Sequence, residues 1–220
     1  MKKYLILIVL LILSCSIEKK NFELSGKIDG LNGEKIYLLE SNSIILDSTK
    51  IDDSSSFTLK CYIEETQILT LRLGDSDTDQ VKFFAETGAM TLSTTSKRFQ
   101  FDAQFSGSKQ QSNLDEFNSY LIKFEEEDIE LLEIQIEESM KSNQKNIDSI
   151  SILRDKIEKR KILFIINYIE NKKEEIISPY IALKYNMNVQ ADYLSKIYNS
   201  YSKEISDSKY GIELKKILEK

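Results

Sequence analysis

Four acidic residues in the first half of the chain have a spacing that could bind calcium. Asp75, Asp77 and Asp79 alternate along the sequence, and Glu86 follows eleven residues after Asp75. Carboxylate oxygens at these positions surround Ca²⁺ in an EF-hand loop. Gln80 stands where that loop requires glycine, and the flanking sequence predicts strands rather than helices. We therefore interpret the segment as a solvated hairpin tip, with weak calcium binding as the alternative.

Residues suited to nucleophilic catalysis or metal binding are scarce. The chain contains no His, so imidazole bases, imidazole ligands and Ser-His or Cys-His pairs are excluded. Ser106 and Lys109 have the spacing found in penicillin-recognising acyl enzymes, but this spacing recurs in a chain rich in Ser and Lys, and the accompanying motifs are absent. We expect no catalytic residue, no cofactor and no metal-binding residue.

Cys61 is expected to be a structural thiol. It lies on a predicted strand, where the neighbouring Lys60 would point to the opposite face. A reactive thiol needs nearby cations or a helix N-terminus to lower its pKa. Burial is therefore the favoured interpretation.

The charge balance excludes a nucleic-acid partner. The chain has 30 Lys and Arg against 36 Asp and Glu, a net charge of -6. Affinity for nucleic acid depends on clustered Lys and Arg that neutralise phosphates, and the sequence has no such cluster. Residues 125–138 instead contain eight acids and no base. We interpret them as a solvated helix face rather than a carboxylate metal cluster.

The first residues of the chain predict export. Lys2 and Lys3 precede an uncharged run, rich in Leu and Ile, over residues 4–13. This is the pattern of a secretory signal, and the run is shorter than the roughly 20 apolar residues of a membrane span. Ser14 and Cys15 end the run, ahead of a polar stretch.

Residues 12–15, Ile-Leu-Ser-Cys, resemble the lipobox of bacterial lipoproteins. In that family the cysteine is lipidated and becomes the first residue of the mature chain. The resemblance implies a signal peptide over residues 1–14, lipid attachment at Cys15 and a tether over residues 15–21. It also implies a cell-envelope protein held at a membrane, with the outer membrane favoured and the periplasmic or surface face left open. A plain signal peptide or an uncleaved anchor is the alternative.

Residues 22–108 predict a β domain. Apolar residues alternate with polar ones in short runs, which is the period of half-buried strands, and Gly- and Asp-containing turns separate the runs. About eight strands at regular spacing indicate an antiparallel sandwich or barrel. The runs cover residues 22–28, 36–38, 44–46, 57–59, 68–73, 81–83, 90–92 and 99–105.

Residues 109–220 predict a helical region of four to five helices, which gives an α+β fold overall. Ser112 or Asn113 is the expected N-cap of the first helix. Its apolar stripe shifts phase near residues 125–128, which indicates a bend. The second helix is expected over about 147–169. Its segment 162–169 is almost continuously apolar and is expected to form the centre of the helical core. Three more are expected, one starting at Ser178 and two over about 191–201 and 209–218.

The order of several short motifs resembles a known family. The motifs are Phe-Glu-Leu-Ser-Gly at residues 22–26, Phe-Phe-Ala-Glu-Thr-Gly at 83–88, Phe-Ser-Gly-Ser at 105–108 and Ser-Pro-Tyr-Ile-Ala-Leu at 178–183. In this order they are similar to the domain of unknown function 4369 family, the module that precedes thioredoxin-like (AhpC/TSA) domains in Bacteroidetes envelope lipoproteins. The resemblance implies an accessory or recognition module.

A thioredoxin-like domain with a Cys-x-x-Cys pair commonly follows in that family, and we expect none in this chain, whose sequence ends at Lys220. We therefore expect a non-catalytic binding or scaffolding module, with the membrane and an envelope protein as partners. One alternative is an accessory component of a thiol-disulfide system that partners a thioredoxin-like protein. Another is a small-ligand or weak calcium binder.

Overall fold

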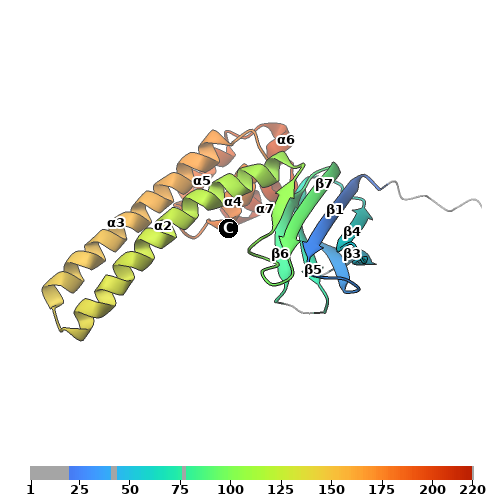
Figure 1. Ribbon diagram of the computed structural model, residues 1–220. Coiled ribbons are helices and arrows are strands. Elements are labelled where there is room, and N and C mark those ends of the chain that lie inside the picture. The colour runs from blue at the N-terminus through green and yellow to red at the C-terminus, as the bar shows by residue number, and fades with distance from the viewer. Residues whose placement is uncertain (1–19, 41–43, 76–77, 220) are drawn as a thin grey trace, which may run out of the picture.

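The computed structural model describes residues 20–40, 44–75 and 78–219, and it confirms the predicted α+β order (Figure 1). The predicted signal peptide, Cys15 and Asp77 lie outside the described residues. The described strands are β1 (Phe22–Asp29), β2 (Lys35–Glu40), β3 (Ile44–Lys50), β4 (Ser56–Cys61), β5 (Gln67–Leu73), β6 (Gln80–Ala85), β7 (Gly88–Thr95) and β8 (Gln104–Ser106).

The strands form a sandwich of two four-stranded sheets, in the orders β4-β1-β7-β8 and β3-β2-β5-β6. Among the described strands, all neighbours are antiparallel except β1 and β7, which run parallel with Phe22 beside Gly88. The prediction of an antiparallel sandwich needs this correction. Parallel neighbours require a long connection, and the chain between β1 and β7 provides it by forming β4 and the second sheet. The strand predicted over 99–105 also needs a correction, because residues 97–102 form turns and a bend, and β8 covers Gln104–Ser106.

One apolar core lies between the two sheets. In β1, Phe22, Leu24 and Ile28 are buried and most of the positions between them are more exposed, as the two-residue period predicts. Cys61 belongs to this core, and it is a free thiol. The buried core residues of the two sheets include Ile36, Leu38, Leu59, Leu69, Leu71, Phe83, Met90 and Leu92.

Six helices follow in the described part of the chain, one more than the largest number predicted. They are α2 (Lys109–Met140), α3 (Gln144–Asn171), α4 (Ile177–Lys184), α5 (Ala191–Tyr198), α6 (Lys203–Ser206) and α7 (Lys209–Leu218). The additional helix, α6, has four residues and is too short to show a helical period. A search of the described residues finds no helix whose length and apolar character would let it cross a membrane.

Helices α2 and α3 form a long antiparallel hairpin that extends beyond the other helices (Figure 1). The hairpin starts one turn earlier than predicted, because Ser108 rather than Ser112 or Asn113 is the N-cap of α2. The Ser108 hydroxyl accepts a hydrogen bond of 2.9 Å from the backbone N–H of Gln111. The helix then continues without interruption through residues 125–128, where the sequence pattern predicts a bend.

One other prediction about the helices needs correction. Helix α4 begins at Ile177, so Ser178 lies inside it, and the Ser178 hydroxyl donates to the backbone carbonyl of Ile169. The prediction for α3 is confirmed, because Ile165, Tyr168 and Ile169 in its C-terminal segment are buried in the helical core. Before residue 160 its buried residues are Ile150 and Ile157.

The helical region covers the outer face of the second sheet. Strand β6 carries consecutive buried residues, of which Phe83 lies in the sandwich core and Phe84 lies in the helical core. The ring of Phe84 makes edge contacts with Tyr180 of α4 and Tyr210 of α7. Because one strand contributes to both cores, the sandwich and the helices pack as one unit.

Candidate functional site

Cys61 is buried, as predicted, with 4% of its surface exposed. Burial raises the pKa of its thiol to about 11, and the nearby carboxylate of Asp47 contributes to the increase. At neutral pH the thiolate is therefore a very small fraction, and the thiolate is the reactive form. This environment gives no support to redox chemistry at Cys61.

Two residues of the candidate calcium loop, Asp75 and Glu86, have other partners in the structure. The hydroxyl of Tyr37 donates to Asp75 over 3.2 Å. The carboxylate of Glu86 accepts hydrogen bonds from the Ser108 hydroxyl and from the backbone N–H of Gln110, so it lies at the N-terminus of α2. Within the described residues, no three His, Cys, Asp or Glu side chains are grouped closely enough to hold a metal ion.

The tyrosines of the helical region contribute mainly to packing. The hydroxyl of Tyr210 accepts a 2.7 Å hydrogen bond from the backbone N–H of Ile68 in β5. Tyr201 shares a hydrogen bond of 2.9 Å with Ser178, and burial raises the pKa of Tyr201 to about 12. These hydroxyls connect helices to one another and to the sheet, so they are not available to a ligand.

A cleft of about 640 Å³ opens between β6, α2 and α4. Tyr180 and Lys184 of α4 line it, together with Lys82 of β6 and Asp115 of α2. Burial lowers the pKa of Lys184 and raises the pKa of Asp115. The cleft could admit a small polar molecule, and it is where the small-ligand alternative would apply. Its lining residues come from four elements, β6, β8, α2 and α4, and from the loops before β6 and β8, so no single local motif reveals it.

The projecting part of the hairpin exposes a stripe of large apolar side chains on α2. All the buried residues of α2 lie at or before Leu121. Ile122, Ile129 and Ile136 then repeat every seven residues and are 50%, 54% and 48% exposed. Leu132 and Met140 extend the stripe, which we call the α2 stripe. In soluble proteins, large apolar side chains gathered on one exposed face and bordered by polar residues are a feature of interaction sites.

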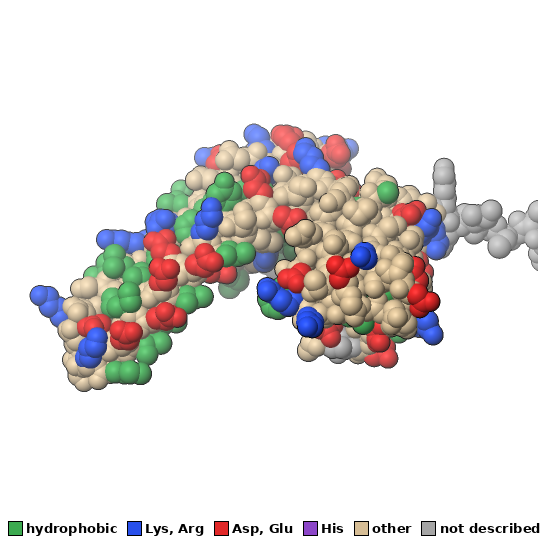
Figure 2. Space-filling view, in the orientation of Figure 1, with side chains coloured by type: hydrophobic (Ala, Val, Ile, Leu, Met, Phe, Trp, Pro, Cys, Tyr) green, Lys and Arg blue, Asp and Glu red, His purple; other side chains and the backbone are tan. Residues whose placement is uncertain are grey.

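Acidic side chains accompany the apolar ones along the projecting hairpin (Figure 2). Some of the acids of residues 125–138 pair with α3. Asp128 binds Arg154 through two hydrogen bonds of 2.8 and 3.0 Å, and the bond from Arg154 is the main reason that the pKa of Asp128 is lowered. Others, including Glu126 and Glu133 beside the stripe, are exposed. The solvated acidic face predicted for residues 125–138 is therefore present, and the apolar residues of the α2 stripe lie among its acidic side chains.

The N-terminal part of the chain also has relatives. Residues 22–114 match the family described as Domain of unknown function (DUF4369). This confirms the resemblance for the motifs at residues 22–26, 83–88 and 105–108, whereas the motif at 178–183 lies outside the matched residues. No curated protein and no solved structure matches the chain.

The DUF4369 match begins with β1 and ends in the first two turns of α2. It therefore spans the whole sandwich and stops before the α2 stripe. The cleft beside β6 is lined partly by the DUF4369 segment and partly by α4. The part of the hairpin beyond Leu121 lies outside the matched residues, so the family description gives no information about its surface.

A groove runs between α2 and α3 on a different face of the hairpin from the α2 stripe. Its distal part, about 300 Å³, has Leu131 and Ile157 among its lining residues, with Glu127 and Glu130 on the α2 side and Lys156 and Arg160 on the α3 side. Its proximal part, about 410 Å³, continues past Arg160 to the base of the hairpin and is lined by Phe124, Leu163, Phe164, Asn167, Tyr168 and Asn171. We call the two parts together the hairpin groove.

Proposed function

We propose that this protein is a lipid-anchored cell-envelope protein that acts as a non-catalytic binding module, with the α2 stripe as its binding surface. The observation that carries the proposal is the exposure of Ile122, Ile129 and Ile136 beyond the last buried residue of α2. None of these three side chains belongs to the helical core, so packing in that core does not account for them. A binding partner would account for them.

The charges beside the stripe favour a basic partner. Glu126 and Glu133 flank the apolar side chains, and neither forms an ion pair in the part of the chain that the structure describes. A partner surface with apolar side chains and Lys or Arg around them would bury the stripe and neutralise these carboxylates. The stripe from Ile122 to Met140 is about 27 Å long at 1.5 Å per residue, which is long enough for a partner helix of several turns.

The position of the hairpin suits an anchored protein. Strand β1, which follows the proposed tether, lies on the side of the sandwich away from the hairpin (Figure 1). A lipid on Cys15 would therefore hold the sandwich near the membrane and leave the hairpin directed away from it. The burial of Cys61 disfavours thiol chemistry at this residue.

A Cys15→Ser variant tests the anchor. We expect the wild-type chain in the membrane fraction and the variant in the soluble fraction after cell disruption and centrifugation, because the thiol that carries the lipid is gone. A Cys61→Ser variant is the matched control and should stay with the membrane. If the Cys15→Ser chain still sediments with the membrane, the lipid anchor is wrong.

A photoreactive amino acid at position 129 tests the binding surface in living cells. We expect irradiation to give one discrete adduct with another protein, and we expect Glu126→Lys to abolish it, because a lysine would repel a basic partner. The same probe at Phe101, which is 79% exposed on the sandwich, is the control. Crosslinking from position 129 no greater than from position 101 would contradict the proposal. An adduct with a thioredoxin-like protein would favour the redox-accessory alternative.

A further inference from the structure

We propose that the hairpin groove binds the same groove of a second copy of this chain, so that two hairpins pack side by side as a four-helix bundle. The inference goes beyond the binding role of the α2 stripe, because none of the stripe residues lines the groove. It stands on the shape of the groove, the exposed apolar residues along it and the arrangement of charge across it.

The groove has an apolar base and apolar side chains at its edge. Phe124, Leu131 and Phe164 line it and are only partly buried by the hairpin itself. Leu153 and Leu163 on the α3 side are 44% and 59% exposed. Two packed helices leave such residues half covered, whereas a second pair of helices laid over them would complete the packing of a four-helix bundle.

The two sides of the groove carry opposite charge. Glu127 and Glu130 lie on the α2 side, and Lys156 and Arg160 lie on the α3 side. Glu127 and Arg160 pair with each other across the groove at 2.9 Å. Glu130 and Lys156 are exposed and form no ion pair with any residue that the structure describes. Each copy therefore has one free acid and one free base on the same face.

This arrangement is complementary to itself under a twofold axis that runs along the groove. Rotation about that axis places α2 of one copy over α3 of the other, at the same height along the hairpin. Glu130 of one copy then lies near Lys156 of the other, and the contact occurs twice. A twofold axis across the groove would instead stack α2 on α2, and the acidic side chains of the two copies would repel each other.

The size and direction of the contact fit a dimer of anchored proteins. The groove extends from Leu153 to Asn171, about 27 Å at 1.5 Å per residue, and a pair of helices is about 20 Å wide. The footprint is about 500 Å² per copy, so the dimer buries about 1,000 Å², the lower limit of specific interfaces. The axis along the groove makes the two hairpins parallel, which keeps both sandwiches at the same end, as two lipid anchors in one membrane require.

Sedimentation velocity of the full mature chain carrying Cys15→Ser tests the proposal. We expect a concentration-dependent dimer at tens of micromolar. Glu130→Lys and Lys156→Glu should each weaken it by about tenfold or more, because each places like charges together twice. An equimolar mixture of these two variants should restore the dimer, because each lysine then faces a glutamate of the other variant. Far-UV circular dichroism verifies that each variant is folded.

Two exposed apolar residues of the hairpin provide a test variant and a matched control for the same sedimentation experiment. Leu163→Glu, in the groove, should dissociate the dimer, whereas Ile129→Glu, on the α2 stripe, should leave it intact. A chain that stays monomeric at about 100 µM overturns the proposal, and so does a mixture of the charge variants that fails to associate. If Ile129→Glu dissociates the dimer and Leu163→Glu does not, the α2 stripe is the dimer interface and the proposal for the hairpin groove is wrong. The crosslinking from position 129 tests the binding role separately, so failure of one proposal leaves the other standing.

Discussion

Replacing Phe84 with alanine is expected to lower the free energy of unfolding by about 3–5 kcal/mol, the usual cost of removing a buried phenylalanine ring. The Phe84 side chain is fully buried, and it touches the rings of Tyr180 and Tyr210 at centroid distances of 5.0 and 6.1 Å. Its removal would leave a cavity where the second sheet meets two helices. Because those helices are held to the sheet there, the loss should reach the whole helical region.

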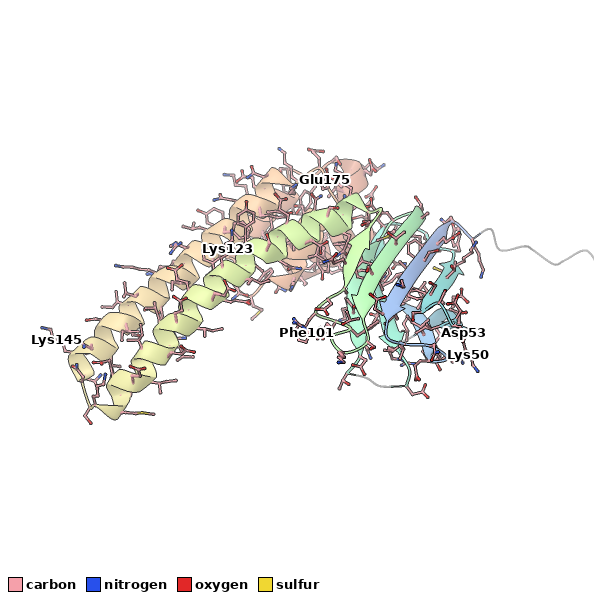
Figure 3. All side chains as sticks on the ribbon, viewed as in Figure 1. Lys50, Asp53, Phe101, Lys123, Lys145 and Glu175 are labelled. Atoms are coloured by element: carbon pink, nitrogen blue, oxygen red, sulfur yellow. The ribbon has the colours of Figure 1, made fainter. Side chains whose placement is uncertain are left out.

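Chemical denaturation followed by far-UV circular dichroism measures the effect. We expect one cooperative transition for the wild-type chain and a lower midpoint for Phe84→Ala. Phe101→Ala is the control, because Phe101 lies on the surface of the sandwich (Figure 3) and is 79% exposed. The control should change the free energy of unfolding by less than about 1 kcal/mol. Equal effects of the two substitutions would show that Phe84 does not join the two parts.

The two adjacent phenylalanines also show how much of the fold was predictable. Alternation along β1 and β4 identifies half-buried strands, because each has one face toward the core. Phe83 and Phe84 break the alternation in β6, and the structure gives the reason: the sandwich covers one face of the strand and the helices cover the other. A strand buried on both faces loses the two-residue period. The sequence therefore indicates that both faces of β6 are buried, but it does not show which elements cover them.

The parallel pairing of β1 and β7 could not be predicted. Local periodicity identifies strands and their faces, but the choice of neighbour depends on contacts between residues more than sixty positions apart, such as Phe22 and Gly88. The short α6 was missed for a different reason. One turn of helix has no repeat to detect, and only its N-cap, Ser202, which accepts a hydrogen bond from the backbone N–H of Ile205, marks its start.

The residues of the candidate binding surface show a helical period in the sequence, but the sequence does not reveal that this face is uncovered. Ile129, Leu132 and Ile136 form a stripe that is out of phase with the one beginning at Leu114, and the phase shift predicts a bend rather than an exposed face. In the structure Leu114 is buried, whereas Ile129 and Ile136 are about half exposed. Helical periodicity shows which residues share a face, and the length of the hairpin relative to α4 and α7 decides whether anything covers that face. How far the hairpin extends beyond α4 and α7 depends on tertiary packing, which local sequence periodicity does not show.

The tight corner between α6 and α7 leads to the second large effect, which we expect for Gly211→Ala. Gly211 lies in the first turn of α7, where Ser208 is the N-cap. A Cβ built on Gly211 would lie 2.2 Å from the carbonyl oxygen of Ile205 and 2.6 Å from that of Ser206. These are backbone atoms, so they cannot move aside by a change of side-chain rotamer. The two helices would have to separate.

We expect Gly211→Ala to lower the free energy of unfolding by about 3 kcal/mol, at the upper end of the cost of overpacking. In an unobstructed helix, the same substitution would instead stabilise by about 1 kcal/mol, because alanine is the better helix former. The sign of the change therefore decides whether the corner is as tight as the structure shows. Lys216→Ala, at an exposed position of α7, is the control and should change stability by less than about 0.5 kcal/mol.

Tyr210 precedes Gly211, so movement of the corner should also break the hydrogen bond from the Ile68 N–H to the Tyr210 hydroxyl. Faster hydrogen exchange of the Ile68 amide in Gly211→Ala would show that the strain reaches the sheet, whereas unchanged exchange would confine it to the corner.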